Sequence, residues 1–262
     1  MNWMKVKIIL IIFFLIINAL LVSILVSRNY DGTFDSEGIA GDVYEILGKR
    51  DISVERDMIK TESVTSKTAY AYPVSSEESA FFGNLVANAE KTEDGKYLYN
   101  GSLIEVYDNF VHFDSLDGLY KNEKDYFESV GIDFDDSRLI SEESNDADGI
   151  FVYYETYDRM EIFGTRATVK KTAGVVVSAD IVWYEISEED SKSAKTISFA
   201  DALLDFAADK GRGNKPCAVV DITRGFSVDA GSESVSVSQM IPAIRLTTEI
   251  GSNFYYDARS PQ

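Results

Sequence analysis

The chain has 262 residues, of which 45% are hydrophobic and 12% aromatic, and its formal net charge at pH 7 is −19. This charge argues against nucleic acid as a partner, because binding to phosphates requires a basic surface. Cys217 is the only cysteine, so no intramolecular disulfide can form and packing alone must hold the fold together. Its apolar neighbours, Ala218 to Val220, predict that Cys217 is a small buried residue and not a reactive thiol.

An apolar block from Ile8 to Val26 follows the cations Lys5 and Lys7 near the start of the chain. At about 1.5 Å per residue, the block makes roughly 28 Å of helix, close to the ~30 Å hydrocarbon core of a bilayer. The sequence therefore predicts a transmembrane helix over residues 8–27.

Charge also predicts the orientation of this helix. Cations precede the block and acidic residues follow it, so the positive-inside rule places a short tail, residues 1–7, in the cytoplasm and the rest of the chain outside the membrane. A cleaved signal peptide is the alternative, but Leu21–Ser23 is a poor cleavage site. We therefore expect a single-pass protein of the cell membrane with an extracytoplasmic domain.

The apolar block contains Asn18 and a stripe of small residues, Ala19, Ser23 and Ser27, spaced four apart. Small residues let helices approach closely, and an amide can form a hydrogen bond between helices. These four residues therefore predict a contact with a transmembrane helix of a partner. The alternative is that a single-pass anchor merely tolerates them.

Beyond a polar tether, residues 28–38, the apolar spacing predicts an α+β fold in which antiparallel sheets have helices on one face. We expect an N-terminal lobe, residues 39–118, and a C-terminal lobe, residues 119–262, which contains two helix-plus-meander units. Helices are expected at 39–47, 77–89, 120–130 and 199–210. Strands are expected at 52–54, 68–74, 97–99, 102–107, 110–113, 150–157, 165–171, 175–186, 218–227, 234–239, 243–249 and 254–258.

Particular residues set the expected ends of these elements. Ser75 or Ser76 should cap the second helix, and Ser198 with Asp201 should form a capping box at the fourth. Pro73 indicates that strand 68–74 lies at the edge of its sheet, because proline has no N–H to donate.

Signatures of enzymes are missing from the sequence. His112 is the only histidine and lies in an alternating strand pattern, so it is predicted to be an ordinary strand residue without a role in metal binding or in a catalytic triad. Residues 211–213 (Gly-Arg-Gly) are predicted to form a helix-exit loop, and residues 188–190 a solvated acidic turn. No cofactor, metal or catalytic residue is expected.

One acidic stretch resembles a calcium-binding loop. Ser144, Asp146, Asp148, Gly149 and Glu155 match positions 1, 3, 5, 6 and 12 of that pattern. Serine replaces the first acidic ligand, however, and a strand-like segment follows where the calcium motif needs a helix. The sequence favours an acidic turn between strands, with a calcium site as the alternative.

Both ends of the chain resemble a known family. The start resembles the YycI branch of the YycH/YycI regulatory proteins, and the last part resembles that family's final domain as well as PepSY-type α+β units. The residues that show this are Trp3, Lys5, Lys7 and Phe14–Asn18, and then Ser198–Leu203, Ile241–Ile244 and Asn253–Ala258. The resemblance covers the apolar block and roughly the last 145 residues. Two departures are Ile244, where family members have an aromatic residue, and the high acidity.

The resemblance implies a membrane-anchored, non-enzymatic regulator of a cell-wall two-component system, which acts with a YycH-like protein on a WalK-like sensor histidine kinase. Under this hypothesis, Asn18, Ala19 and Ser23 touch a transmembrane helix of the kinase. The alternative is an anchored PepSY-type module that binds wall material or inhibits a secreted protease. An anchored hydrolase is a third hypothesis, and it would depend on carboxylates that the sequence does not identify.

Overall fold

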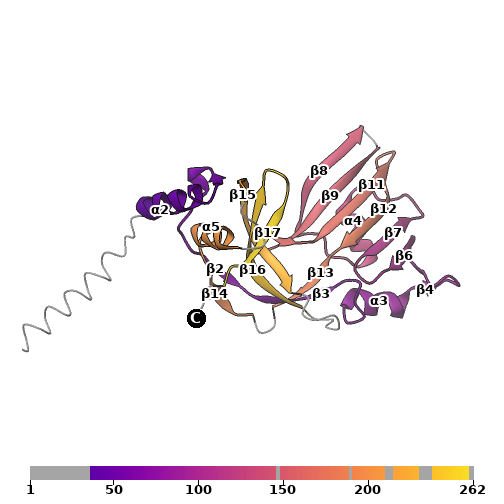
Figure 1. The fold of residues 1–262 in the computed structure, drawn as a ribbon. Coiled ribbons are helices and arrows are strands. Elements are labelled where there is room, and N and C mark those ends of the chain that lie inside the picture. Colours follow the sequence, from indigo (N-terminus) through magenta and orange to yellow (C-terminus); the bar gives the residue numbers. More distant parts are fainter. Residues whose placement is uncertain (1–35, 146–147, 189–190, 210–214, 230–237, 260–262) are drawn as a thin grey trace, which may run out of the picture.

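The computed structural model describes residues 36–145, 148–188, 191–209, 215–229 and 238–259. In these ranges the chain forms two lobes that share one large sheet (Figure 1). The α-helices are α2 (Ser36–Gly48), α3 (Ala80–Asn88), α4 (Glu123–Val130) and α5 (Phe199–Ala208). A short 3₁₀ helix, η1, spans Arg56–Met58.

The large sheet has 15 strands, and β14 and β2 form a separate pair. In chain order the strands are β1 (Ile52–Val54), β2 (Thr65–Lys67), β3 (Ala69–Pro73), β4 (Glu90–Lys91), β5 (Tyr97–Tyr99), β6 (Ser102–Val106), β7 (Val111–Ser115), β8 (Ser137–Asn145), β9 (Asp148–Tyr157), β10 (Met160–Phe163), β11 (Arg166–Thr172), β12 (Val175–Val182), β13 (Tyr184–Ser187), β14 (Ser193–Lys195), β15 (Cys217–Asp229), β16 (Ser238–Thr248) and β17 (Asn253–Asp257).

The first lobe contains strands β4 to β9, β11 and β12, covered on one face by α3 and α4. Its core includes a row of side chains that crosses four strands: Ile104 lies opposite Phe113, Phe113 opposite Ala179, and Ala179 opposite Val169. All four residues are buried. Phe113 also packs against Phe81, Tyr126 and Phe127 of the two helices, with ring centroids 5.9 to 6.4 Å apart.

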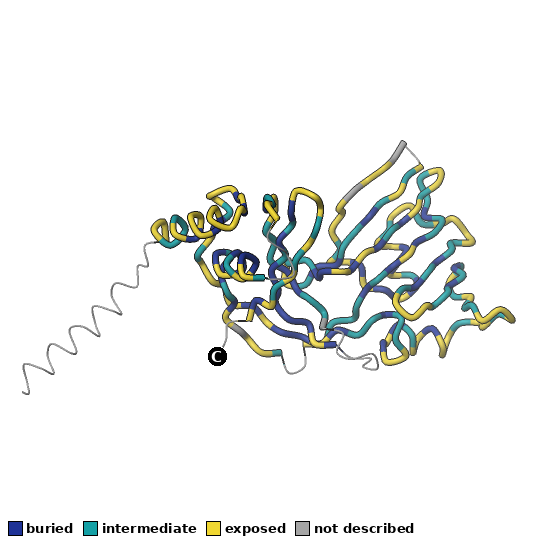
Figure 2. The backbone as a smooth tube through the Cα atoms, in the orientation of Figure 1, coloured by how far each residue is buried: buried dark blue, intermediate teal, exposed yellow. Residues whose placement is uncertain are grey.

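The second lobe is built on β15 and β16, with α2 and α5 packed on them. Ser198 begins α5: its hydroxyl accepts a hydrogen bond from the N–H of Asp201, whose carboxylate accepts one from the N–H of Ser198. This is the capping box that the sequence predicts. Figure 2 shows that buried segments follow the strands of both lobes, whereas β8 and much of α2 are exposed.

Two sets of strands join the lobes. The β9–β10 hairpin leaves the first lobe, and β10 pairs in parallel with β15 in the second. In addition, Pro73 of β3 lies opposite Tyr184 of β13, and the N–H of Val74 donates to the carbonyl of Trp183 at 3.0 Å. A small core fills this junction; it consists of Ala69, Ala71, Ile162, Phe226 and Met240.

The expectation of antiparallel sheets is wrong, and the expectation of a transmembrane anchor is not supported. The large sheet is mixed and not antiparallel, because β1 and β10 both pair in parallel with β15, one after the other along the same strand. Among the residues that the structure describes, no helix is long and apolar enough to cross a membrane. The predicted single-pass anchor and membrane localisation are therefore not shown. The predicted tail 1–7 and transmembrane helix 8–27 lie outside the described residues.

Local predictions were more successful than those about pairing. The expected helix at 39–47 and strand at 52–54 correspond to α2 and β1, and Gly131 ends α4 with a left-handed φ of 89°. The cap of α3 is Ser79 and not Ser75 or Ser76, since the Ser79 hydroxyl accepts from the N–H of Phe82 at 3.0 Å. The β7 strand pairs with β12, so one sheet continues across residue 118, where the sequence suggested a division.

Pro73 does not lie on an edge strand. In the described part of the chain, β3 runs between β13 and β16: Pro73 lies opposite Tyr184 of β13, and the described residues of β16, which begin at Ser238, pair with Ala69–Ala71. The expectation of an edge strand is therefore wrong.

Candidate functional site

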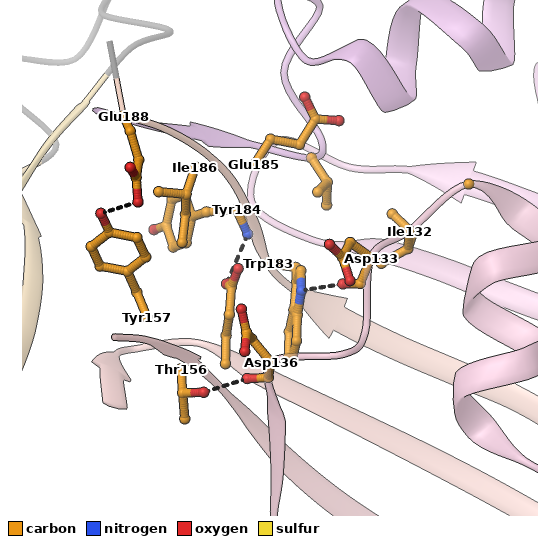
Figure 3. A pocket seen from close by; sticks show the side chains of 13 residues that line it. Ile132, Asp133, Asp136, Thr156, Tyr157, Trp183, Tyr184, Glu185, Ile186 and Glu188 are labelled. Atoms are coloured by element: carbon orange, nitrogen blue, oxygen red, sulfur yellow. Dashed lines mark hydrogen bonds between the residues drawn. The ribbon is translucent and has the colours of Figure 1, made fainter. Parts of the chain in front are cut away.

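A cavity of about 440 Å³ lies where the two lobes join (Figure 3). Its lining comes from the segment after α4, the end of β9, and the β12–β13 connection with β13. The lining residues are Val74, Gly131, Ile132, Asp133, Asp136, Glu155, Thr156, Tyr157, Trp183, Tyr184, Glu185, Ile186 and Glu188. Five of them are acidic and none is basic, so the lining has a strongly negative charge.

The segment after α4 is held in place by main-chain hydrogen bonds. Gly131 reverses the chain at the end of the helix. The Trp183 indole N–H then donates to the carbonyl of Asp133 at 3.1 Å, and the Thr156 hydroxyl donates to the carbonyl of Asp136 at 2.7 Å (Figure 3). These bonds use main-chain oxygens and leave the two aspartate carboxylates out, of which that of Asp133 accepts the N–H of Asp135 at 3.0 Å.

Glu155 is the most buried acid in the cavity lining, with 4% of its surface exposed. Its backbone N–H donates to the Thr165 hydroxyl at 3.0 Å, and one carboxyl oxygen accepts from the N–H of Tyr184 at 3.0 Å. Among the described residues, the other carboxyl oxygen has no hydrogen-bond partner. Burial raises the pKa of Glu155 well above its ordinary value, and the charges of Asp133 and Asp136 raise it further against the opposing effect of the Tyr184 N–H.

The other two glutamates of the cavity have partners. Glu185 accepts from the backbone N–H groups of Ala80 and Phe81 at 2.7 and 2.6 Å, which neutralises part of its charge at the start of α3. Glu188 accepts from the Tyr157 hydroxyl at 2.8 Å. Burial, together with this hydrogen bond, raises the pKa of Tyr157 to about 12, so its hydroxyl stays protonated.

No serine, cysteine, lysine or histidine lines the cavity, whereas threonine, tyrosine and carboxyl side chains do. Within the described ranges, no group of three or more histidine, cysteine or acidic side chains is placed to hold a metal ion. The cavity combines acidic hydrogen-bond acceptors with the aromatic side chains of Tyr157, Trp183 and Tyr184.

The comparisons with known proteins name no family. No protein-family model matches the chain, and no curated protein matches it. Among solved structures, an uncharacterized protein from Eubacterium rectale is similar with a TM-score of 0.42 and 11% identity, over 76% of this chain and 85% of that one. The Bacillus megaterium YpeB C-terminal domain is similar with a TM-score of 0.27 and 11% identity, over 86% of this chain and 93% of that one.

Neither similarity supports the YycI part of the expected resemblance. At these TM-scores the likeness is too distant to transfer a fold or a function to this chain.

The residues predicted as a partner contact, Asn18, Ala19, Ser23 and Ser27, lie outside the described residues. The loop at 211–213 also lies outside them. Cys217 is half-buried on β15 and packs against the core of the second lobe.

The calcium pattern is on a β-hairpin. Ser144 on β8 lies opposite Gly149 on β9, and Asp146 is outside the described residues. Glu155 follows Asp148 by seven strand residues, or roughly 23 Å, so the two carboxylates cannot share an ion. The Asp148 carboxylate instead accepts from the N–H of Ala173 at 2.7 Å. The calcium pattern therefore does not bring Asp148 and Glu155 together, and the turn between the two strands lies outside the described residues.

His112 lies on β7, as predicted, on the face of the sheet opposite the core. Its Nδ1 is 2.7 Å from an Asp180 carboxylate oxygen, and its Nε2 is 3.3 Å from one of Asp114. Partial burial lowers the pKa of His112, but the two aspartates outweigh this effect and raise the pKa above its ordinary value.

Sequence reasoning missed the cavity residues. The one signal within reach was Glu155, an acid inside the apolar strand pattern at 150–157, whose side chain should have suggested a buried carboxyl group. Glu188, predicted to lie in a solvated turn, is exposed but lines the cavity.

Proposed function

We propose that the protein is a non-enzymatic binding module that regulates a partner protein, and that the cavity between the lobes is its binding site. The cavity is the observation that supports this proposal. Its volume of about 440 Å³ is within the usual range for ligand sites, and it brings a few polar groups together with aromatic walls.

The partners we propose are a WalK-like sensor histidine kinase and a YycH-like protein, which act in a cell-wall two-component system. Their support is the resemblance at the two ends of the sequence. The alternative is a PepSY-type module that inhibits a secreted protease or binds wall material.

Affinity capture of the full chain from its native cells tests the proposal. The site variant is Asp133→Asn with Asp136→Asn, because both side chains are exposed and asparagine keeps their shape. The control is Glu90→Gln with Glu93→Gln, which removes the same charge from exposed positions at β4 and the turn after it, away from the cavity. We expect the wild type and the control to recover the kinase and the YycH-like protein, and the site variant to recover at least fivefold less.

Each other result contradicts one part of the proposal. Recovery of neither protein with the wild type would reject these partners, and recovery of a protease in their place would favour the inhibitor alternative. Equal recovery with both variants would show that the partner binds elsewhere.

A further inference from the structure

We infer that the cavity binds the ammonium group of a lysine side chain on the partner, and that Glu155 releases its proton when this group binds. The inference rests on the proposed function, because it names the chemical group that the binding site receives.

The charges around the cavity favour a cation. Asp133 and Asp136 come from the segment after α4, while Glu185 and Glu188 come from β13 and the residue that follows it. Two of these charges are partly satisfied, Glu185 by the start of α3 and Glu188 by Tyr157. Asp133 accepts the N–H of Asp135 at 3.0 Å, a hydrogen bond that leaves its negative charge in place.

The remaining titratable groups that face the cavity leave this charge uncompensated. Tyr157 and Tyr184 both have a raised pKa and stay neutral. The nearby cation Lys124 contacts Asp135, which does not line the cavity. The cavity therefore has excess negative charge and no basic group of its own.

The placement of the acids favours ammonium over guanidinium. The carboxylates reach the cavity from three separate segments and do not form one planar pair. A lysine ammonium is a compact charge with three donors that can point in different directions, whereas the flat guanidinium group of arginine suits a single carboxylate in a two-bond geometry. The aromatic side chains of Tyr157, Trp183 and Tyr184 can cover the methylene groups of a lysine side chain.

Glu155 connects this binding to pH. Burial raises the pKa of the Glu155 carboxyl well above its ordinary value, which favours the protonated form in the empty cavity, and one of its oxygens has no hydrogen-bond partner among the described residues. A cation beside a carboxyl group favours its ionised form, so binding removes the proton from Glu155 to the solvent. By linkage, affinity rises with pH, by up to about tenfold per unit, until Glu155 is already ionised in the free protein.

Isothermal titration of the full chain with N-acetyl-lysine amide tests the inference, at low salt and from pH 6 to pH 8. N-acetyl-norleucine amide is the uncharged control ligand, N-acetyl-arginine amide tests the choice of cation, and butylammonium presents the lysine side chain without its main chain. Titration in two buffers with different ionisation enthalpies counts the protons released. We expect the lysine compound and butylammonium to bind at least tenfold more tightly than the norleucine and arginine compounds and to release about one proton.

The Glu155→Gln variant tests whether Glu155 is the source of the released proton. Glutamine retains an acceptor for the Tyr184 N–H, and we expect binding that releases no proton and no longer strengthens with pH. Thermal unfolding verifies that the variant folds, and Glu93→Gln serves as the matched control with wild-type behaviour.

Several results would overturn the inference. One is a norleucine or arginine compound that binds as tightly as the lysine compound. The others are butylammonium that does not bind and wild-type binding without proton release. If the lysine compound does not bind but partner capture still depends on Asp133 and Asp136, the inference fails and the proposed function stands. If it binds while capture yields no partner, the proposed function fails instead.

Discussion

Replacing Glu155 with glutamine should stabilise the folded protein, and the gain should grow with pH. Glu155 has a raised pKa when folded, so it stays protonated there while the unfolded chain ionises it above its ordinary value near 4.5. Each pH unit between the two pKa values therefore lowers wild-type stability by about 1.4 kcal/mol relative to the variant. From pH 5 to pH 7 the difference grows by up to about 2.7 kcal/mol, or roughly 5–10 °C in melting temperature for a chain of this size.

Urea unfolding at pH 4, 5, 6 and 7 measures this difference, and Glu93→Gln provides the baseline for an exposed glutamate. At pH 4 Glu155 is mostly protonated in both the folded and the unfolded state, so the linkage contribution is small. If the difference in free energy of unfolding between variant and wild type stays constant or shrinks as the pH rises, Glu155 is not protonated in the folded protein. The physical explanation of the site would then fail with it.

Three further changes test the rest of the fold. His112→Gln should destabilise the protein at pH 5.5 and have little effect at pH 8.5. The pKa of His112 is raised in the folded protein, so its stabilising charge is present at low pH and is lost as the pH rises through the folded-state pKa. Thermal unfolding at both pH values measures this. Phe113→Ala should cost about 3–5 kcal/mol in urea unfolding, since it opens a cavity in a fully buried row, and a loss below 1 kcal/mol would contradict the described packing. Ser198→Ala should cost about 1 kcal/mol by the same measurement, and Ser198→Asp should restore most of it if the loss comes from the cap of α5.

Elements whose signal is local could be predicted from the sequence. The capping box at Ser198 and Asp201, and the glycine that ends α4 at Gly131, both depend on residues within one turn. The strands expected at 102–107 and 110–113 likewise pair as the β6–β7 hairpin. In each of these cases the stabilising contact and the sequence pattern involve the same few residues.

The sequence does not predict five strands, β2, β4, β8, β10 and β14, and the two longest of them, β8 and β10, lack the usual signal. β8 lies at the edge of its sheet with most of its side chains in solvent, so it shows no alternation of apolar and polar residues. The β9–β10 hairpin turns at Asp158 and Arg159, which both have positive φ, 49° and 64°. Glycine or asparagine would have marked such a turn, and this pair does not.

Long-range pairing could not be predicted at all. The apolar run at 175–186 predicts one strand, but the segment changes partners at Trp183, with β12 in the first lobe and β13 beside β3. The cavity depends on this exchange, because Tyr184 and Glu185 reach Glu155 and Asp133 only where the lobes meet. Periodicity predicts which face of a strand is apolar, and it contains no information about which strand lies next to it.

The pairing of Pro73 with Tyr184 also describes how the first lobe is attached to the rest of the chain. The first lobe is formed by residues 74–183, whose two ends lie next to each other on the paired strands β3 and β13. It is therefore an insertion in a host domain formed by the residues on either side, except that β10 pairs with β15 of the host. An insertion with neighbouring ends can vary in length or sequence without displacing the strands that hold it. The point of attachment includes three residues that also line the cavity, Val74, Trp183 and Tyr184. The site therefore lies at the boundary between host and insertion, where a change in either segment alters its lining.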